Sequence, residues 1–310
     1  MLTATQKKTA QAIVNIFETG VALGEYGDVT LIAGDTGHLT FGRSQTTLGS
    51  GNLAMLLARY CANAGARFSA QLKPYLPRFE ACDLSLDHEP HLHNILRASA
   101  DDPVMRETQD VFFDEVYWAA AERAAKSLGI VTPLGMAVVY DSMVHGAFKL
   151  IRDRTNAKCG SPGSAGEQAW ISEYVAQRDA WLRNNPRADL RGTVYRMEAM
   201  RRLIELKEWG LDLPLVVRGV EVSAAALSAT PPHCYDGPAP GSRALGLQSP
   251  LARGLDVRLL QLGLSAQGAE IKADGVFGKS SGEHIKTYQK KKGLPPTGIA
   301  DAALVLEIVG

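Results

Sequence analysis

The run from Leu134 to Phe148 limits most strongly what this chain can fold into. It is mostly apolar, so a helix formed there would have no face to offer to water and would be buried on all sides. The run therefore predicts a helix buried through the middle of a domain. Asp141 lies inside the run, between Tyr140 and Ser142. Because an isolated buried carboxylate is too costly, Asp141 must have a partner.

Two later helical patterns each supply an arginine. Arg178 and Arg196 share helical faces with apolar side chains, which are Trp170, Ile171 and Tyr174 for the first and Met200 and Leu203 for the second. Both arginines should therefore point into the core or into a cleft. A buried ion-pair network that only fixes helix packing is compatible with this pattern, and so is one that holds catalytic carboxylates in position.

The N-terminal helical stretch carries an acidic residue in a distinctive setting. Thr5 is predicted to cap a helix whose buried stripe comprises Ala10, Ile13, Val14 and Phe17. Gly20 ends this helix, so Glu18 lies in its last turn. The negative end of the helix dipole and the neighbouring Phe17 both disfavour an ionised carboxylate there. Glu18 is therefore predicted to be a general acid, a role that requires the group to hold its proton.

A second acidic residue follows in a different setting. Asp35 lies in the turn Gly34-Asp35-Thr36-Gly37, before a short strand-like run from Leu39 to Phe41. This open, polar position suits an ionised base. Two carboxyl groups in contrasting environments are the pattern of glycosidic bond hydrolysis. The alternative is that Glu18 is merely solvated at a helix end and that Asp35 serves the turn.

Composition bounds the partners of the chain. With 310 residues and 45% hydrophobic composition, it can bury a sizeable core and is expected to form two domains. The formal net charge is zero, so no basic surface argues for a nucleic acid as the main partner. No stretch approaches the roughly 20 apolar residues needed to span a bilayer, so no membrane partner is expected.

No metal or cofactor is predicted. The four cysteines are widely scattered and lack CxxC spacing. Three histidines, His88, His91 and His93, lie in or beside a proline-containing loop region. Without a recognisable ligand frame, surface histidines are the preferred interpretation over a metal site.

The chain divides at a segment rich in Ala, Ser, Pro and Gly. Residues 223–250 are predicted to be a semi-extended linker. Residues 1–222 then form the first domain, mainly α with a small β-hairpin region. Residues 251–310 carry three helical stripes, on Val257, Leu260 and Leu264, on Ile285 and Tyr288, and on Leu304 and Ile308. They form a second, small three-helix domain.

The C-terminal residues resemble a known binding module. They contain Leu260-Gln261, Asp274-Gly275-x-Phe277-Gly278, Tyr288-Gln289, Gly293-Leu294, Thr297-Gly298 and Asp301. This combination resembles the three-helix peptidoglycan-binding domain over residues 251 to 310. The resemblance implies a polysaccharide partner in the bacterial cell wall.

The first domain resembles the chitosanases of glycoside hydrolase family 46, which belong to the lysozyme-like superfamily. The resemblance implies a lysozyme-like fold and an inverting mechanism. It places Glu18 as the general acid, Asp35 as the base, and Thr40 as a residue that helps to orient the attacking water. The family's Asp and two Arg behind the cleft correspond to Asp141, Arg178 and Arg196, the same three residues that the helical faces single out.

Asn52 departs from the family pattern. It stands where chitosanases have an aspartate that meets the ammonium group of glucosamine, and a neutral amide removes that charge-assisted contact. Together with the wall-binding module, this predicts hydrolysis of the β-1,4 bonds of peptidoglycan, as in a muramidase. The alternatives are a chitosanase acting on chitosan and, from another class, a non-catalytic peptidoglycan-binding protein.

The opening stretch also bears on localisation. It is an amphipathic helix with Lys7, Lys8 and Glu18, not a signal peptide with an uninterrupted apolar centre. We therefore expect a protein made in the cytoplasm that reaches the cell wall, in the periplasm or outside the cell, by another route. Lysis, phage-type release by an endolysin or a contact-dependent secretion machinery for antibacterial effectors would each supply that route. An immunity protein is a further partner to be considered.

Overall fold

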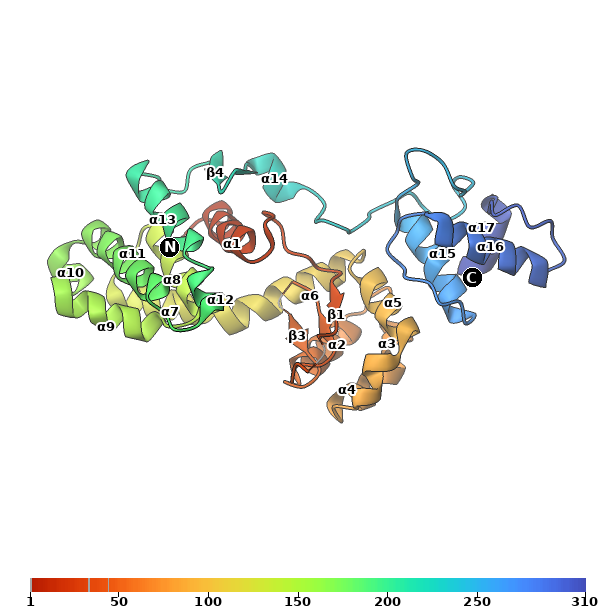
Figure 1. The fold of residues 1–310 in the computed structure, drawn as a ribbon, viewed down its shortest axis with the longest axis horizontal. Coiled ribbons are helices and arrows are strands. Elements are labelled where there is room, and N and C mark those ends of the chain that lie inside the picture. Colours follow the sequence, from red (N-terminus) through yellow and green to blue (C-terminus); the bar gives the residue numbers. More distant parts are fainter. Residues whose placement is uncertain (1, 33, 44) are drawn as a thin grey trace. The chain divides into compact units, whose positions relative to one another are not determined.

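Figure 1 shows the computed structural model of the chain, which describes residues 2–32, 34–43 and 45–310. The chain packs as two units. The first contains residues up to Gly24 and Phe113–Ala229, and the second contains Glu25–Phe112 and Thr230–Gly310. Both are mainly helical with small antiparallel sheets, as the sequence predicts. Within the described ranges, no helix combines the length and apolar character needed to cross a membrane.

In the first unit, α8 (Pro133–His145) forms the centre. It contacts α1 (Ala4–Thr19), α7 (Ala119–Leu128), α11 (Glu167–Arg183) and α13 (Tyr195–Glu205), which lie around it in Figure 1. This confirms the buried helix predicted from its apolar run. The other elements of the unit are η3 (Asp114–Trp118, a π-helical turn), α9 (Phe148–Cys159), α10 (Pro162–Ala165), α12 (Ala188–Arg191), β4 (Leu215–Val217), β5 (Val220–Val222) and α14 (Ala224–Ser228).

Two helix ends differ from the prediction. The run up to Phe148 is not one helix, because Gly146 and Ala147 have φ values of 91° and 67°, which end α8 and start α9 anew. At the N-terminus, the cap of α1 is Thr3 and not Thr5. Thr3 and Gln6 form a capping box, in which each side chain bonds the other residue's backbone N–H, and this satisfies two helix-end donors at once.

The second unit begins with a three-stranded antiparallel sheet. Its strands are β1 (Val29–Thr30), β2 (Thr40–Phe41) and β3 (Thr46–Thr47), with β2 in the middle. The sheet is followed by α2 (Asn52–Ala62), α3 (Ser69–Leu72), η1 (Lys73–Tyr75), α4 (Leu76–Glu80), η2 (Leu84–His88), α5 (Pro90–Ser99) and α6 (Pro103–Phe113).

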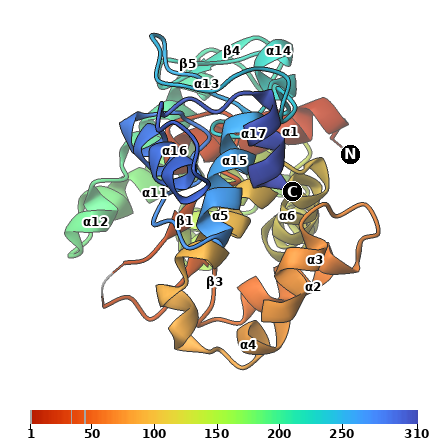
Figure 2. The same cartoon turned by 90° about the vertical axis from the view of Figure 1, so that its right-hand side faces the viewer.

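The C-terminal helices pack into the same unit. They are α15 (Leu255–Ala266), α16 (Lys279–Lys291) and α17 (Ala302–Val309), and their shared core includes the fully buried Phe277. This confirms the small three-helix arrangement. Figure 2 shows α15 beside α5, and the two helices are in contact. Leu262 of α15 belongs to the core formed by α2 and α5.

The segment predicted as a linker is not uniformly extended. It begins with α14, and Cys234 and Leu245 within it are buried. Leu245 pairs with Ala300 through two backbone hydrogen bonds of 2.8 Å. Proline and glycine content indicates the absence of regular structure but does not show whether a segment packs against its neighbours. The domain limits at 222 and 251 stay a prediction.

Candidate active site

Glu18 lies at the end of α1, and its side chain is 45% exposed. Its Oε1 accepts a hydrogen bond from Nη2 of Arg196 on α13. The apolar setting predicted for Glu18 is therefore wrong: the sequence shows the helix dipole and Phe17 but not the distant arginine. Phe17 packs against that arginine, with its ring centroid 5.4 Å from Cζ.

Asp141 is fully buried on α8, and Arg196 is its partner. Nη1 of Arg196 donates to Oδ1 of Asp141 at 2.5 Å. The arginine side chain is only 2% exposed. One guanidinium thus joins a buried carboxylate to the half-exposed carboxylate of Glu18. The requirement for a charge partner of Asp141 is confirmed.

Arg178 is buried on α11 but does not complete the predicted trio directly. Its Nη1 donates to the carbonyl of Gly146 at 2.7 Å, and its Nη2 donates to Nδ1 of His145 at 2.9 Å. Since a guanidinium only donates, His145 accepts at Nδ1 and carries its ring proton on Nε2. Sequence reasoning missed His145, although its place four residues after Asp141 puts both on one face of α8.

His145 makes the first unit sensitive to acid. Burial, together with the charges of Arg196 and Arg178, lowers the pKa of His145 to about 4. The unfolded chain therefore binds a proton near pH 6.5, where the folded chain does not, and stability is lost as the pH falls from 6.5 toward 4.

We expect the free energy of unfolding to fall by about 1–2 kcal/mol more in the wild type than in His145→Asn over this range, after allowance for solvent screening. Asparagine keeps an acceptor for Arg178 but does not titrate. Urea unfolding at pH 7 and pH 4.5 measures the difference. Equal losses in the two proteins would contradict this role of His145.

Asp35 lies in the exposed loop between β1 and β2, the open and polar setting that the sequence predicts. Its backbone N–H donates to the carbonyl of Ile32 at 3.1 Å. The loop passes very close to Gly49. The Gly49 N–H donates to the carbonyl of Gly37 at 3.0 Å, and a Cβ added at Gly49 would lie 2.3 Å from the carbonyl oxygen of Thr36. Only glycine fits there, so Gly49 helps to set the path of the loop that carries Asp35.

Thr40 is buried in β2, opposite Thr30 and Thr47. Its Oγ1 donates to the carbonyl of His38 at 3.0 Å. Asp87 of η2 holds the entry to this strand, because its carboxylate accepts from the Leu39 N–H at 2.9 Å and contacts Nδ1 of His38 at 2.9 Å. No local pattern in the sequence pointed to Asp87.

Asn52 is the exposed first residue of α2. Its N–H donates to Oγ of Ser50 at 3.3 Å, which confirms the turn predicted to precede this helix. Glu18, Asp141 and Arg196 are thus joined in the first unit, while Asp35, Thr40 and Asn52 belong to the second. The catalytic and binding roles of these residues stay predictions.

The surface position predicted for the three histidines holds for His88 but is wrong for His93, which is buried. His91 and His93 lie on α5, and His88 ends η2. Nε2 of the buried His93 donates to the carbonyl of Leu86 at 3.0 Å. Within residues 2–32, 34–43 and 45–310, no group of three His, Cys, Asp or Glu side chains is arranged to hold a metal ion.

Two family models match the chain. Residues 12–215 match the model described as glycosyl hydrolase family 46, and residues 253–305 match a peptidoglycan binding domain. The first match includes Glu18, Asp35, Thr40 and Asn52 as well as Asp141, Arg178 and Arg196.

Relatives in sequence and in structure agree with the first match. A chitosanase of Bacillus subtilis (strain 168) is 27% identical over 239 residues, which are 71% of this chain and 84% of the relative. The native chitosanase of Bacillus subtilis MY002 superimposes with a TM-score of 0.58 at 26% identity, over 70% of this chain and 96% of that one. A Gynuella sunshinyii chitosanase in complex with chitotetraose has the same fold, with a TM-score of 0.58, 24% identity and coverage of 72% and 98%.

Proposed function

Because the chain belongs to glycosyl hydrolase family 46, a family of glycosidases with a lysozyme-like fold, we propose that it hydrolyses β-1,4 bonds between amino sugars by an inverting mechanism. In the proposed reaction, Glu18 donates a proton to the glycosidic oxygen as its bond to the anomeric carbon breaks. Asp35 takes a proton from a water whose oxygen forms the new bond to that carbon from the opposite face. The proposal requires no metal or cofactor.

The observation that carries this proposal is the chain of contacts from Asp141 through Arg196 to Glu18. Arg196 holds Oε1 of Glu18 and so orients the carboxyl group, which leaves Oε2 as the atom that would carry the proton. A buried arginine fixed by a second carboxylate has little freedom to move, and catalysis by a positioned acid depends on that rigidity. In the second unit, the Thr40 hydroxyl donates to the carbonyl of His38 and retains lone pairs that could accept from a water.

Chitosan is the first candidate substrate. The relatives above are named chitosanases, and a variant of the Bacillus subtilis MY002 enzyme, 26% identical to this chain, was solved in complex with 6 GlcN. The likeness to these proteins extends over the whole first domain, so a polymer of β-1,4-linked glucosamine is the substrate that similarity supports best.

Peptidoglycan glycan strands are the second candidate, and two observations favour them. Residues 253–305 match a peptidoglycan binding domain, which would concentrate the enzyme on cell wall. Asn52 presents a neutral amide at the exposed start of α2, where it offers no charge to an ammonium group. An N-acetylated sugar suits this position at least as well as a cationic one.

Side-by-side hydrolysis separates the two candidates. Reducing ends released from chitosan and from purified peptidoglycan would be measured with the same enzyme preparation, and mass spectrometry of the fragments would identify the bond. Release from at least one polymer is expected. The Asn52→Asp variant should shift the ratio of the two rates toward chitosan by about tenfold, the value of one charge-assisted contact. An enzyme that leaves both polymers at their original length would refute the proposed reaction.

A further inference from the structure

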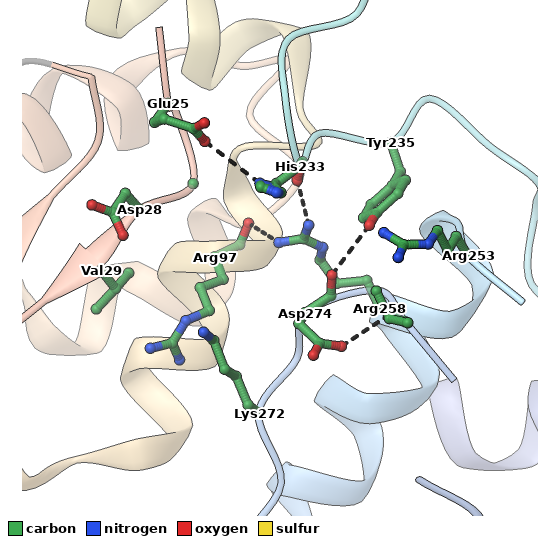
Figure 3. Close-up of a pocket in the computed structure, with 12 residues that line it drawn as sticks. Glu25, Asp28, Val29, Arg97, His233, Tyr235, Arg253, Arg258, Lys272 and Asp274 are labelled. Atoms are coloured by element: carbon green, nitrogen blue, oxygen red, sulfur yellow. Dashed lines mark hydrogen bonds and ion pairs between the residues drawn. The ribbon is translucent and has the colours of Figure 1, made fainter. Parts of the chain in front are cut away.

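The second unit contains a pocket of about 480 Å³ that the proposed reaction does not use. Figure 3 shows that side chains from three parts of the unit line it: the segment preceding and entering β1, helix α5, and the C-terminal part of the chain. The C-terminal contribution includes Tyr235, Arg253 and Lys272. The pocket therefore exists only where the binding module meets the catalytic domain.

The contacts of Arg258 hold these parts together. Its side chain is 3% exposed, and its Nε lies 3.0 Å from Oδ2 of the fully buried Asp101. Its two terminal nitrogens donate to the carbonyls of Arg97 and His233. Asp101 in turn accepts from the Tyr235 N–H at 2.8 Å. Since this charge is compensated within the protein, Arg258 forms the floor of the pocket and is not available to a ligand.

Three other cations line the pocket without a close ion pair of this kind. Arg97 donates to Oδ1 of Asn94 at 3.1 Å, a neutral partner. Within the described part of the chain, the side chains of Arg97, Arg253 and Lys272 form no ion pair with a carboxylate within 4.0 Å. Burial lowers the pKa of Arg97, the nearby Arg258 cation lowers it further, and an anion bound in the pocket would offset this repulsion.

Acidic groups line the same pocket. Glu25 and Asp28 come from the segment that enters β1 and lie across the pocket from Arg253 in Figure 3. Glu25 is 3.6 Å from Nδ1 of His233, whereas Asp28 forms no ion pair among the residues described. Asp274, from the C-terminal part of the chain, lines the pocket too, and the charges of Asp28 and Asp274 both raise the pKa of Arg97. A cavity that contains both basic and acidic groups matches a ligand that carries both charges.

We propose that this pocket binds a peptide group bearing a free ammonium and free carboxylates, the chemistry of the peptide side chains of peptidoglycan. The carboxylates would meet Arg97 and Lys272, and the ammonium would meet Asp28. Chitosan carries ammonium groups only and would give Arg97 and Lys272 no carboxylate to pair with. The inference rests on the second candidate of the proposed function and gives the enzyme a contact with the wall beyond the glycan strand.

Direct binding tests the inference independently of catalysis. The probe is the tetrapeptide N-acetyl-L-Ala-γ-D-Glu-meso-diaminopimelate-D-Ala, whose one free amine is that of diaminopimelate, titrated calorimetrically into the 310-residue protein. Amidation of its carboxylates and acetylation of its free amine should each weaken binding at least about tenfold, because each removes charge-assisted hydrogen bonds. Lys272→Gln and Asp28→Asn should weaken binding of the unmodified peptide to a similar extent. Lys279→Gln, an exposed substitution outside the pocket, is the matched control and should have no effect.

The outcomes separate the inference from the proposed function. Equal affinity for the modified and unmodified peptides, or unchanged affinity in Lys272→Gln, would overturn the pocket assignment. Hydrolysis of a peptide-free glycan by Lys272→Gln at the wild-type rate, alongside weakened peptide binding, would support it. If the wild-type protein hydrolyses glycan but binds the modified peptides as tightly as the unmodified one, the pocket assignment alone is refuted. Absence of hydrolysis of every glycan refutes the proposed function and leaves the binding result to stand by itself.

Discussion

Glu18→Gln is expected to lower the turnover number on the preferred polymer by roughly 10²–10⁴-fold, the usual contribution of a positioned general acid. Glutamine keeps the size of the side chain and can still accept a hydrogen bond from Arg196, but it has no proton to donate to the leaving oxygen. Asp35→Asn removes the base and should have an effect of similar size. Initial rates of reducing-end release measure both losses.

The control for this experiment is Glu122→Gln, an exposed position on α7. It should retain the wild-type rate, and thermal unfolding should show that all variants are folded. Should Glu18→Gln retain the wild-type rate as well, Glu18 is not the acid, and the mechanism proposed here fails.

Arg196→Met is expected to have the largest effect on stability. The substitution leaves Asp141 fully buried without a cation, and breaking a buried pair on one side destabilises a protein by about 3–5 kcal/mol. Activity should fall too, because the Glu18 carboxyl group loses the partner that orients it. Urea unfolding and reducing-end assays at the same temperature measure the two effects.

A double variant separates packing from positioning. In Asp141→Leu with Arg196→Met, neither buried charge remains, and stability should return to near the wild-type value. Activity should stay low, because Glu18 still lacks its partner. If the double variant recovered full activity, Arg196 would act only through packing. If Arg196→Met alone unfolded at the wild-type urea concentration, the buried pair would contribute little.

Regular helical patterns made much of the first unit predictable. The apolar run around Asp141 is indeed a central helix, and the faces of Arg178 and Arg196 are indeed buried. These predictions succeeded because burial of one helical face depends on spacing within a single segment. The charge partner of Asp141 followed from a physical requirement that any fold must satisfy.

Contacts between distant segments were not predictable in the same way. Arg196 is 178 residues from Glu18 in the sequence, and no local pattern shows that its second terminal nitrogen reaches that carboxylate. Arg178 was placed correctly in the core, but its partner is His145 and not Asp141. Helical faces show that a side chain is buried, whereas the choice among several buried partners depends on how the helices are rotated against one another.

The packing of the C-terminal helices was the feature that the sequence predicted least. Composition suggested a free tether, yet both ends of the Asn94 amide on α5 form hydrogen bonds with this module. Nδ2 donates to Oγ of Ser265 and to the carbonyl of Ile271, and Oδ1 accepts from the Ala273 N–H at 2.9 Å. Nothing in the local sequence of α5 distinguishes Asn94 from an ordinary polar helix residue.

Asn94 also has a consequence for how such a chain can change by recombination. A foreign catalytic domain fused to these three helices would leave the Ala273 N–H and the Ile271 carbonyl without their amide, and Arg258 without Asp101. Unsatisfied buried polar groups cost about 1–3 kcal/mol each, and charged ones cost more. Recombination would therefore be tolerated only where the segment encoding α5 is transferred together with the C-terminal helices. Otherwise, the new catalytic domain must already present an equivalent amide and carboxylate.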